Sequence, residues 1–329
     1  MTDIDSATPE PPVLRLGEPE DLLSAIPYLL KYHPSDSLVF LLLRGHRLIV
    51  TARLGINFLE EADGSAIAAY LQRVCAEHDA DGLVLVGYFR DPACASVLLV
   101  DVMMELESVA VQSALVADGT HWWPCICEHE EWEDCDCEAG TPYDVSTSAV
   151  AAQAVLAGIS ALPSREALAS SVAGPQSRQA RDTAAALMEE ALRALSELDL
   201  GERRDRMALL VERHLLDREP LSDRDCAELA VLAYEGPVRD IAVGRIRPDD
   251  AAAHVTLWHR VVSQTVAPFE SAPLCLLGLA AWISGNGALQ VVCMERAERI
   301  NPDYSLLQIL DQINARALAP SVWEQLRAA

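Results

Sequence analysis

The chain changes character at Gly140-Thr141-Pro142, and this change constrains its fold more than any other feature. Before this point, short apolar runs that suit buried strands alternate with segments of helical period. Beyond it, almost every segment carries apolar residues at helical spacing. Alternating strands and helices predict an α/β domain with a mixed sheet, and helices joined by short loops predict antiparallel helix packing. We therefore expect an α/β N-terminal domain followed by an all-α multi-helix domain.

Three parts follow from this pattern. Residues 1–13 are polar, acidic and rich in proline, which is typical of a disordered tail. Residues 14–145 form the expected α/β domain, which includes a cysteine-rich hairpin at 121–138, and residues 146–329 form the helical domain. Strands are predicted at 38–43, 48–54, 83–88 and 109–116, a short strand followed by a helix within 14–30, and helices at 64–77 and 93–106. Further helices are predicted at 146–158, 164–172, 178–198, 202–217, 223–234, 237–243, 249–266, 272–284, 288–300, 304–317 and 321–329.

The last helices carry features of a helical repeat. Leu277-Gly278, Ala297 and Pro302-Asp303-Tyr304 match the leucine-glycine, alanine and proline positions of a tetratricopeptide unit. Gln290 stands where that unit has a small residue, and no clear second copy precedes it. Because a lone repeat cannot bury its own face, we expect repeat-like packing within the helical domain and not a full array.

Charge and hydropathy exclude several classes of protein. The formal net charge of −25 argues against nucleic acid as a partner, because a polyanion would be repelled. A local cluster, Arg203, Arg204 and Arg206, is interpreted as the solvated face of a helix. The apolar run from Leu274 to Ile283 is too short to cross a bilayer, and residues 1–12 lack the features of a signal peptide. We expect a cytoplasmic protein that does not enter a membrane.

Nine cysteines in such a compartment are expected to be reduced. Five of them lie singly in apolar helical patterns and are expected to be buried and inert: Cys75, Cys94, Cys226, Cys275 and Cys293. The other four form two Cys-x-Cys pairs in one acidic segment, Cys125 with Cys127 and Cys135 with Cys137. A hairpin that turned at Glu131 would set Cys127 opposite Cys135 and Cys125 opposite Cys137, with all four sulfurs on one face.

Such a face is the start of a structural zinc site, since zinc prefers four cysteine or histidine ligands. The two pairs stand about 6.8 Å apart along the strand, so the sulfurs converge only if the hairpin distorts or if His129 or His121 replaces one. Seven acidic residues between Glu128 and Glu138 favour the approach of a cation. Two alternatives stay open: free cysteines in an acidic loop, and cross-strand disulfides.

A second constellation comprises His33, Asp36, Ser37 and Arg53. A turn and the end of a hairpin strand could bring these side chains together at a sheet edge. Serine, histidine and aspartate suggest a nucleophilic triad, but triads are built from segments far apart in the sequence. Asp36 and Ser37 are therefore interpreted as turn residues that lead into the strand.

Several short motifs are spread along the chain: the run from Asp21 to Val39, Thr51-Ala52-Arg53, Trp122-Trp123, Gly140-Thr141-Pro142, Leu162-Pro163-Ser164-Arg165-Glu166, Gly285-Asn286-Gly287-Ala288-Leu289 and Asn301-Pro302-Asp303-Tyr304-Ser305. Together they resemble the actinobacterial domain-of-unknown-function family 4192, over roughly residues 14–323. Members of that family carry a lone cysteine followed by Cys-Cys-Pro, whereas this chain has two Cys-x-Cys pairs. The resemblance implies a bacterial cytosolic setting and no particular activity.

The sequence favours a noncatalytic interaction or scaffold protein. Its helices would bind a protein partner, and zinc would stiffen the cysteine hairpin. One alternative is an enzyme with a site between the domains that uses His33, Asp36 and Arg53, or the metal held by the cysteines. Another is a thiol redox sensor. No motif in the sequence names a reaction or a partner.

Overall fold

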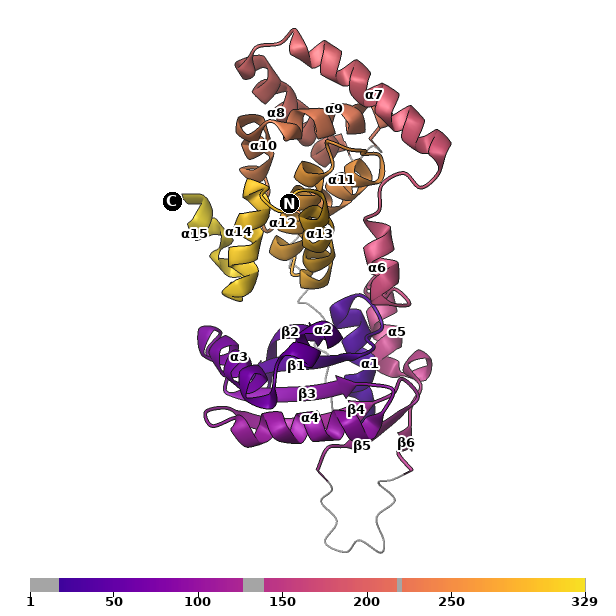
Figure 1. The fold of residues 1–329 in the computed structure, drawn as a ribbon, viewed down its shortest axis with the longest axis vertical. Coiled ribbons are helices and arrows are strands. Elements are labelled where there is room, and N and C mark those ends of the chain that lie inside the picture. The colour runs from indigo at the N-terminus through magenta and orange to yellow at the C-terminus, as the bar shows by residue number, and fades with distance from the viewer. Residues whose placement is uncertain (1–17, 127–138, 218–220, 329) are drawn as a thin grey trace, which may run out of the picture. The chain divides into compact units, whose positions relative to one another are not determined.

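The computed structural model describes residues 18–126, 139–217 and 221–328 (Figure 1). The chain divides into two compact units, and each is described by itself. Unit 1 comprises Met1–Ala68 and Gly82–Pro163, and unit 2 comprises Ala69–Asp81 and Ser164–Ala329. The predicted fold class is confirmed, because a mixed six-stranded sheet with helices precedes a region of many helices. The predicted domain boundaries stay a prediction.

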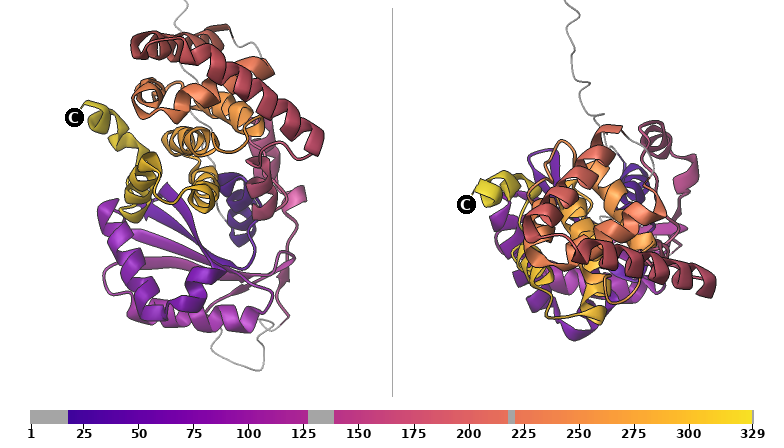
Figure 2. Two further views of the ribbon diagram at one scale, coloured as in Figure 1. Left: turned by 45° about the horizontal axis from the view of Figure 1, so that its top comes forward. Right: turned by 90° about the horizontal axis from the view of Figure 1, so that it is seen from above.

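Unit 1 is built on a sheet in the order β2-β1-β3-β4-β5-β6. Strands β3 and β4 are parallel, and every other neighbouring pair is antiparallel. The strands fan out across the sheet in the left view of Figure 2, as twisted strands do. Their bounds are β1 Ser37–Arg44, β2 Arg47–Gly55, β3 Gly82–Tyr88, β4 Ala110–Ala117, β5 His121–Pro124 and β6 Thr141–Pro142.

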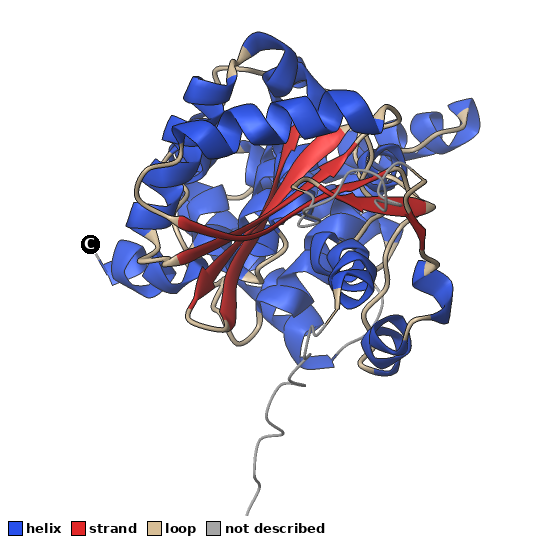
Figure 3. Ribbon diagram, turned by 90° about the horizontal axis from the view of Figure 1, so that it is seen from below, coloured by secondary structure: helices blue, strands red, loops and turns tan. Residues whose placement is uncertain are grey.

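Helix α4 (Pro92–Glu105) connects the two parallel strands and covers one face of the sheet (Figure 3). It begins as the sequence predicts, since the Asp91 carboxylate accepts a hydrogen bond from the Ala93 amide at 3.0 Å. Gly87 in β3 allows close packing, because a Cβ atom there would stand 3.4 Å from that of Ala95. The buried Leu99 also contacts this position. Every residue of β3 is buried, which explains its continuous apolar run.

Helix α1 (Pro19–Leu30) lies on the opposite face. Side chains alternate along a strand, so Trp122 and Trp123 of β5 point to different faces. Trp122 donates from its indole nitrogen to the Glu20 carboxylate of α1 at 3.0 Å. Helix α5 (Ala149–Leu156), which follows the short η3 (Val145–Thr147), packs against α1. A six-residue helix after β2, α2 (Ile56–Glu61), is not among the predicted elements; it has no side-chain cap that would have marked its start.

Unit 2 is helical throughout the part that is described. Helix α3 (Gly64–Glu77) begins in unit 1 and ends in unit 2, where the Arg73 side chain donates to the Ala315 carbonyl at 2.7 Å. The remaining helices match the predicted segments closely. They are α6 Arg165–Ser171, α7 Arg178–Ser196, α8 Leu200–Asp217, α9 Asp223–Tyr234, α10 Gly236–Val243, α11 Ala251–Ser263, α12 Ser271–Ile283, α13 Gly287–Ile300, α14 Ser305–Ala315, η4 Pro320–Val322 and α15 Trp323–Ala328.

Helix α12 forms the centre of unit 2, and all its residues are buried. It packs against α11 and α13. The turn to α13 contains Gly285 at φ +80°, and the Asn286 side chain accepts from the Leu289 amide at 3.1 Å. Gly278 brings the two helices close, since a Cβ atom there would lie 3.4 Å from that of Cys293. The hairpin matches the predicted pair of helices, and the repeat-like character stays a prediction.

The arginines that the sequence places on a solvated helix face pair with acids of neighbouring helices. Arg203 of α8 lies 3.3 Å from Glu235, and Arg206 donates to the Glu228 carboxylate of α9 at 2.8 Å. These pairs neutralise two arginines of the predicted cluster. None of the helices in the described ranges combines the length and the apolarity that a bilayer crossing requires.

Candidate functional site

The base of the cysteine segment is fixed to the sheet of unit 1. After β5 the chain continues along β4, because the Cys125 amide donates to the Ala114 carbonyl at 2.9 Å. The Cys125 thiol lies 3.7 Å from the Ser96 carbonyl of α4, to which it donates. Burial raises the pKa of this thiol. Cys125 is thus a half-buried group held between the sheet and α4.

The other predicted ligands, Cys127, His129, Cys135 and Cys137, lie outside the described residues. The strand register at the base still constrains the predicted hairpin. His121 pairs with Pro142 and Trp122 with Thr141, so paired residue numbers add to 263. The predicted pairing of Cys125 with Cys137 adds to 262. A shared face for the four sulfurs therefore requires a one-residue bulge beyond these pairs.

His121, the alternative ligand, has partners of its own in unit 1. Its Nδ1 atom lies 3.0 Å from the Thr120 hydroxyl, and its ring lies 6.1 Å from that of Trp123. Gly140, at φ +70°, lies directly under the Trp123 ring, where a Cβ atom would stand 2.5 Å from the indole. This contact explains why the Gly-Thr-Pro motif starts with glycine. Within the ranges that are described, no group of three histidine, cysteine or acidic side chains could hold a metal ion.

The expectation that five cysteines are buried is right for four of them. Cys75, Cys226, Cys275 and Cys293 are buried, and burial raises the pKa of each thiol. For Cys94 the expectation is wrong. It lies in the first turn of α4 on the side away from the sheet, where its thiol donates to the Asp91 carboxylate at 3.3 Å. Helical periodicity alone does not show which face of an apolar helix is covered.

The second constellation gathers at the start of β1 but does not form a triad. Arg53 of β2 donates to the Ser35 carbonyl at 3.3 Å, and Asp36 takes a left-handed backbone conformation at φ +43°. His33 is only partly exposed, and burial of the rest of its side chain lowers the imidazole pKa. Ser37 is completely buried, and its hydroxyl has no hydrogen-bond partner among the described residues. Ser37 is therefore inaccessible as a nucleophile in this structure.

Sequence reasoning missed Tyr88, which lies directly opposite Ser37 in the sheet register. Its hydroxyl is also buried without a hydrogen-bond partner in the described structure, and burial raises its pKa well above the usual value. Tyr143 lies near it, and burial together with the Asp118 charge raises the Tyr143 pKa to about 12. A tyrosine at the end of an otherwise aliphatic strand was the available signal. Buried hydroxyls without a partner, such as those of Ser37 and Tyr88, are where a water molecule or a small polar ligand can bind.

The Asp118 carboxylate, which lies near Tyr143, accepts several hydrogen bonds. It accepts from the amides of Thr120 and His121, both at 2.7 Å. Burial acts to raise the Asp118 pKa, but these hydrogen bonds outweigh it and lower the pKa. Asp118 is therefore a turn-forming carboxylate, and the unsatisfied groups in this region are the two hydroxyls.

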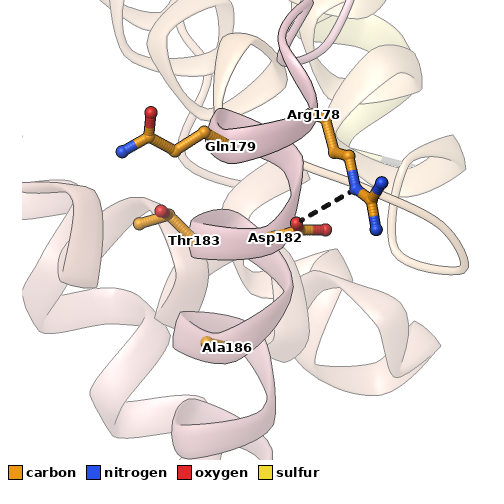
Figure 4. Close-up of a pocket in the computed structure, with 5 residues that line it drawn as sticks. All are labelled: Arg178, Gln179, Asp182, Thr183 and Ala186. Carbon is orange, nitrogen blue, oxygen red and sulfur yellow. Dashed lines mark ion pairs between the residues drawn. The ribbon is translucent and has the colours of Figure 1, made fainter.

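A shallow depression lies on the surface of unit 2 along α7 (Figure 4). Its only ion pair joins Arg178 to Asp182 at 3.8 Å, and both side chains are largely exposed. All of the residues that line it come from this one helix, so it is a groove between neighbouring side chains and not an enclosed binding site. The lining residues are Arg178, Gln179, Asp182, Thr183 and Ala186.

Comparison with known families adds one finding. The model of a family described as "Domain of unknown function (DUF4192)" matches residues 19–321. No curated protein and no solved structure matches the chain.

Proposed function

Because this chain belongs to the DUF4192 family, whose description names no function, we propose its role from its own residues: a noncatalytic cytoplasmic interaction protein with a structural zinc site in its cysteine segment. Two regions are involved. The cysteine segment of unit 1 binds the metal, and the helices of unit 2 bind a protein partner. Neither role needs a reaction centre.

Support for the metal comes from Cys125. Its strand is fixed to β4 by a backbone hydrogen bond, and its thiol is directed at α4. One ligand is therefore held in place before the metal binds, which lowers the entropy lost on binding. The raised thiol pKa means that the metal displaces a proton, so affinity falls as the pH is lowered. In this proposal Cys127, Cys135 and Cys137 complete a tetrahedral set of zinc ligands, and His129 is the alternative ligand that could replace one of them.

Elemental analysis of the protein purified without chelator tests the metal site. We expect about one equivalent of zinc per chain. The double variant Cys127→Ser with Cys135→Ser loses the zinc and melts at a lower temperature, because a structural metal contributes directly to folding. The control is Cys94→Ser, whose thiol is exposed and bonded to Asp91; it keeps the metal.

Two results would contradict the metal site. Protein without metal whose melting is unchanged in the double variant leaves a loop of free cysteines. Protein without metal in which two thiols oxidise and are restored by reductant supports the redox sensor instead. Thiol titration before and after reduction separates these outcomes.

Support for a protein partner comes from the outer face of α8. Its inner face is fully buried and includes Met207, Leu210 and Val211. On the other side, Leu209 is 55% exposed and Leu216, two turns later, is 73% exposed. Exposed leucines at a spacing of seven form one stripe along a helix, and such stripes are typical of helix-mediated recognition.

Affinity capture from a lysate of the source cells tests this role with paired baits. We expect at least one protein to be captured by the native chain and lost with Leu209→Glu plus Leu216→Glu. The control bait carries Leu156→Glu, an equally polar change at an exposed leucine of α5 in unit 1. The same set of proteins on all three baits would contradict partner binding by α8.

One observation favours a second candidate function, binding of a small polar ligand in unit 1. Ser37 and Tyr88 are paired in the sheet near the carboxyl end of β3, where α/β sheets commonly bind ligands, and both hydroxyls are buried without a partner among the described residues. His33, Asp36 and Arg53 of the alternative enzyme site lie in the neighbouring turn and strand. The variant Tyr88→Phe distinguishes a ligand-binding hydroxyl from one that is only buried and unpaired. It weakens ligand binding in the first case and stabilises the fold in the second.

A further inference from the structure

His254 of α11 is a buried histidine whose ring lacks good hydrogen bonds. The side chain has no exposed surface, and neither ring nitrogen has a hydrogen-bond partner among the described residues. Asp250, one turn earlier on the same helix, lies 3.6 Å from Nε2, which is too long for a hydrogen bond. This site therefore suits the neutral imidazole, because a buried charge without hydrogen bonds is costly.

Groups from two other elements influence this ring. The charge of His214, in the last turn of α8, lowers the pKa of His254, whereas Asp250 and the backbone of Arg245 act to raise it. Burial is the largest effect and keeps the pKa below the usual 6.5. Helices α9 and α12 also pack against α11, and none of their charged groups is among those that influence His254 in the described structure. Below pH 6.5, any state that exposes His254 therefore binds a proton that the closed structure resists.

The linker that precedes α11 is held in place beside His254. The Asp250 carboxylate accepts a hydrogen bond from the Arg247 amide at 2.8 Å. The Trp323 indole donates to the Ile246 carbonyl, also at 2.8 Å, and the Ile246 side chain is completely buried. A movement of this linker away from His254 would break all of these contacts.

Helix α8 is held differently along its length (Figure 1). Three ion pairs tie it to α9 and to the start of α10, and the last of them joins Arg213 to Asp225 at 2.9 Å. Residues 214–217 follow as the last turn of α8, in which Leu216 is 73% exposed. This turn can move away from His254 while the three ion pairs stay intact.

We propose that protonation of His254 opens the last turn of α8, residues 214–217, and that unit 2 thereby carries an acid-sensitive switch. The turn is closed at neutral pH and opens as the pH falls towards about 5.5. In the open state the protonated ring gains water as a hydrogen-bond partner and is no longer held beside the charge of His214. The rest of α8 stays in place through its ion pairs.

The switch has a consequence for partner binding. Leu216 lies in the last turn of α8 and belongs to the exposed leucine stripe that begins at Leu209. When this turn opens, Leu216 leaves the stripe, and a partner that binds both leucines is released at low pH. This consequence rests on the proposed function of α8, whereas the switch itself is a property of the chain alone.

Hydrogen–deuterium exchange of the full chain, followed by mass spectrometry at pH 7.0 and pH 5.5, tests the switch. Exchange times are scaled for the intrinsic rate at each pH. We expect the peptide that contains residues 209–217 to lose protection several-fold at pH 5.5. The upper limit is about tenfold for a histidine whose pKa is about 6.5 when exposed. At both pH values this peptide should exchange faster than peptides from the core helix α12, because its opening is local.

Two variants change the switch in opposite directions. His254→Phe removes the titrating group, so the pH dependence of this peptide disappears. Asp250→Asn keeps an acceptor for the Arg247 amide but removes the charge that favours a protonated ring in the closed state, so the loss of protection at pH 5.5 grows. The control His46→Phe, in the exposed turn between β1 and β2 of unit 1, keeps the native pH dependence.

Three results overturn the switch. One is an equal loss of protection in the native chain and in His254→Phe, and another is an unchanged loss in Asp250→Asn. The third is a 209–217 peptide that exchanges as slowly as α12 at both pH values, because the turn then opens only when unit 2 unfolds. If the switch operates on the chain but captured proteins stay bound at pH 5.5, the switch stands and partner binding through Leu216 is contradicted.

Discussion

Helices α4 and α12 are both largely apolar, yet they differ in how much of their surface the chain covers. Every residue of α12, Ser271–Ile283, is buried, with α11, α13 and α14 packed around it. In α4 the sheet covers one side and leaves Val97 and Met104 exposed. The two sequences have a similar apolar character, so the difference lies in the number of neighbours that the fold supplies.

The contrast shows that apolar residues around a helix can have two different structural causes. Where neighbouring helices follow at short loops, as around α12, apolar residues on all sides indicate a central core helix. Where a helix only connects two parallel strands, one side faces outward, and apolar residues there need a reason outside the unit.

The largest expected effect is in α12. Leu276→Ala should lower the free energy of unfolding by about 2–5 kcal/mol, because Leu276 has no exposed surface and its truncation leaves a cavity. Denaturant unfolding of the full chain, followed by circular dichroism, measures it. The matched control is Leu209→Ala in α8, where the side chain is half exposed and the loss stays within about 0.5 kcal/mol. Similar losses in both variants would break the distinction between covered and uncovered helix faces.

An intermediate effect is expected at the start of α12. Arg296 donates to the Glu270 carboxylate and to the Val172 carbonyl, and the side chains of Arg296 and Glu270 are each 17% exposed. Arg296→Gln leaves the Glu270 charge largely buried without its partner and should cost about 2–3 kcal/mol. Arg178→Gln removes only the exposed pair with Asp182 and should cost less than about 0.5 kcal/mol. Thermal melting that does not separate the two variants would argue against a buried pair.

The buried side of α11 should give unit 2 a dependence on pH. His254 has no exposed surface, and burial lowers its pKa below the usual 6.5, although Asp250 at 3.6 Å acts in the opposite direction. The other groups that influence it are His214 of α8 and the backbone of Arg245. The unfolded chain then binds a proton that the folded chain resists, so stability falls as the pH drops below about 6.5, by roughly 1.4 kcal/mol for each unit of pKa difference.

His254→Phe should flatten this part of the stability profile, because phenylalanine fills a similar volume and does not titrate. Urea unfolding at a series of pH values between 5 and 8 shows the slope. The control is His46→Phe, since His46 is exposed in the turn between β1 and β2 of unit 1. An unchanged slope in His254→Phe would place the titrating group elsewhere.

Sequence patterns predicted the elements of this fold well, for identifiable reasons. The helix predicted at 223–234 coincides with Asp223–Tyr234, where Ser222 caps the first turn and accepts a hydrogen bond from the Asp225 amide. Strand β3 was marked by a continuous apolar run, because both of its faces are buried. Helix caps and apolar runs depend on neighbouring residues alone, so the sequence predicts them without knowledge of the fold.

Features that depend on strand register or on the neighbours of a helix could not be predicted from the local sequence. The pairing of Ser37 with Tyr88 follows from the alignment of β1 and β3, whose sequences are separated by two helices and another strand. The exposure of Cys94 depends on what lies outside α4. The base register of His121 with Pro142 differs by one residue from the predicted hairpin, and a shift of one residue moves side chains to the other face.

The smallest effect on stability, and the most informative for the comparison, is expected on the exposed side of α4. Val97→Ala should change the unfolding free energy by less than about 0.5 kcal/mol when the protein is dilute, because the side chain is 62% exposed. Leu99→Ala, two residues away on the buried side, should cost about 2–5 kcal/mol under the same conditions. A large cost of Val97→Ala in dilute solution would instead mean that part of the same chain covers α4, and the contrast with α12 would disappear.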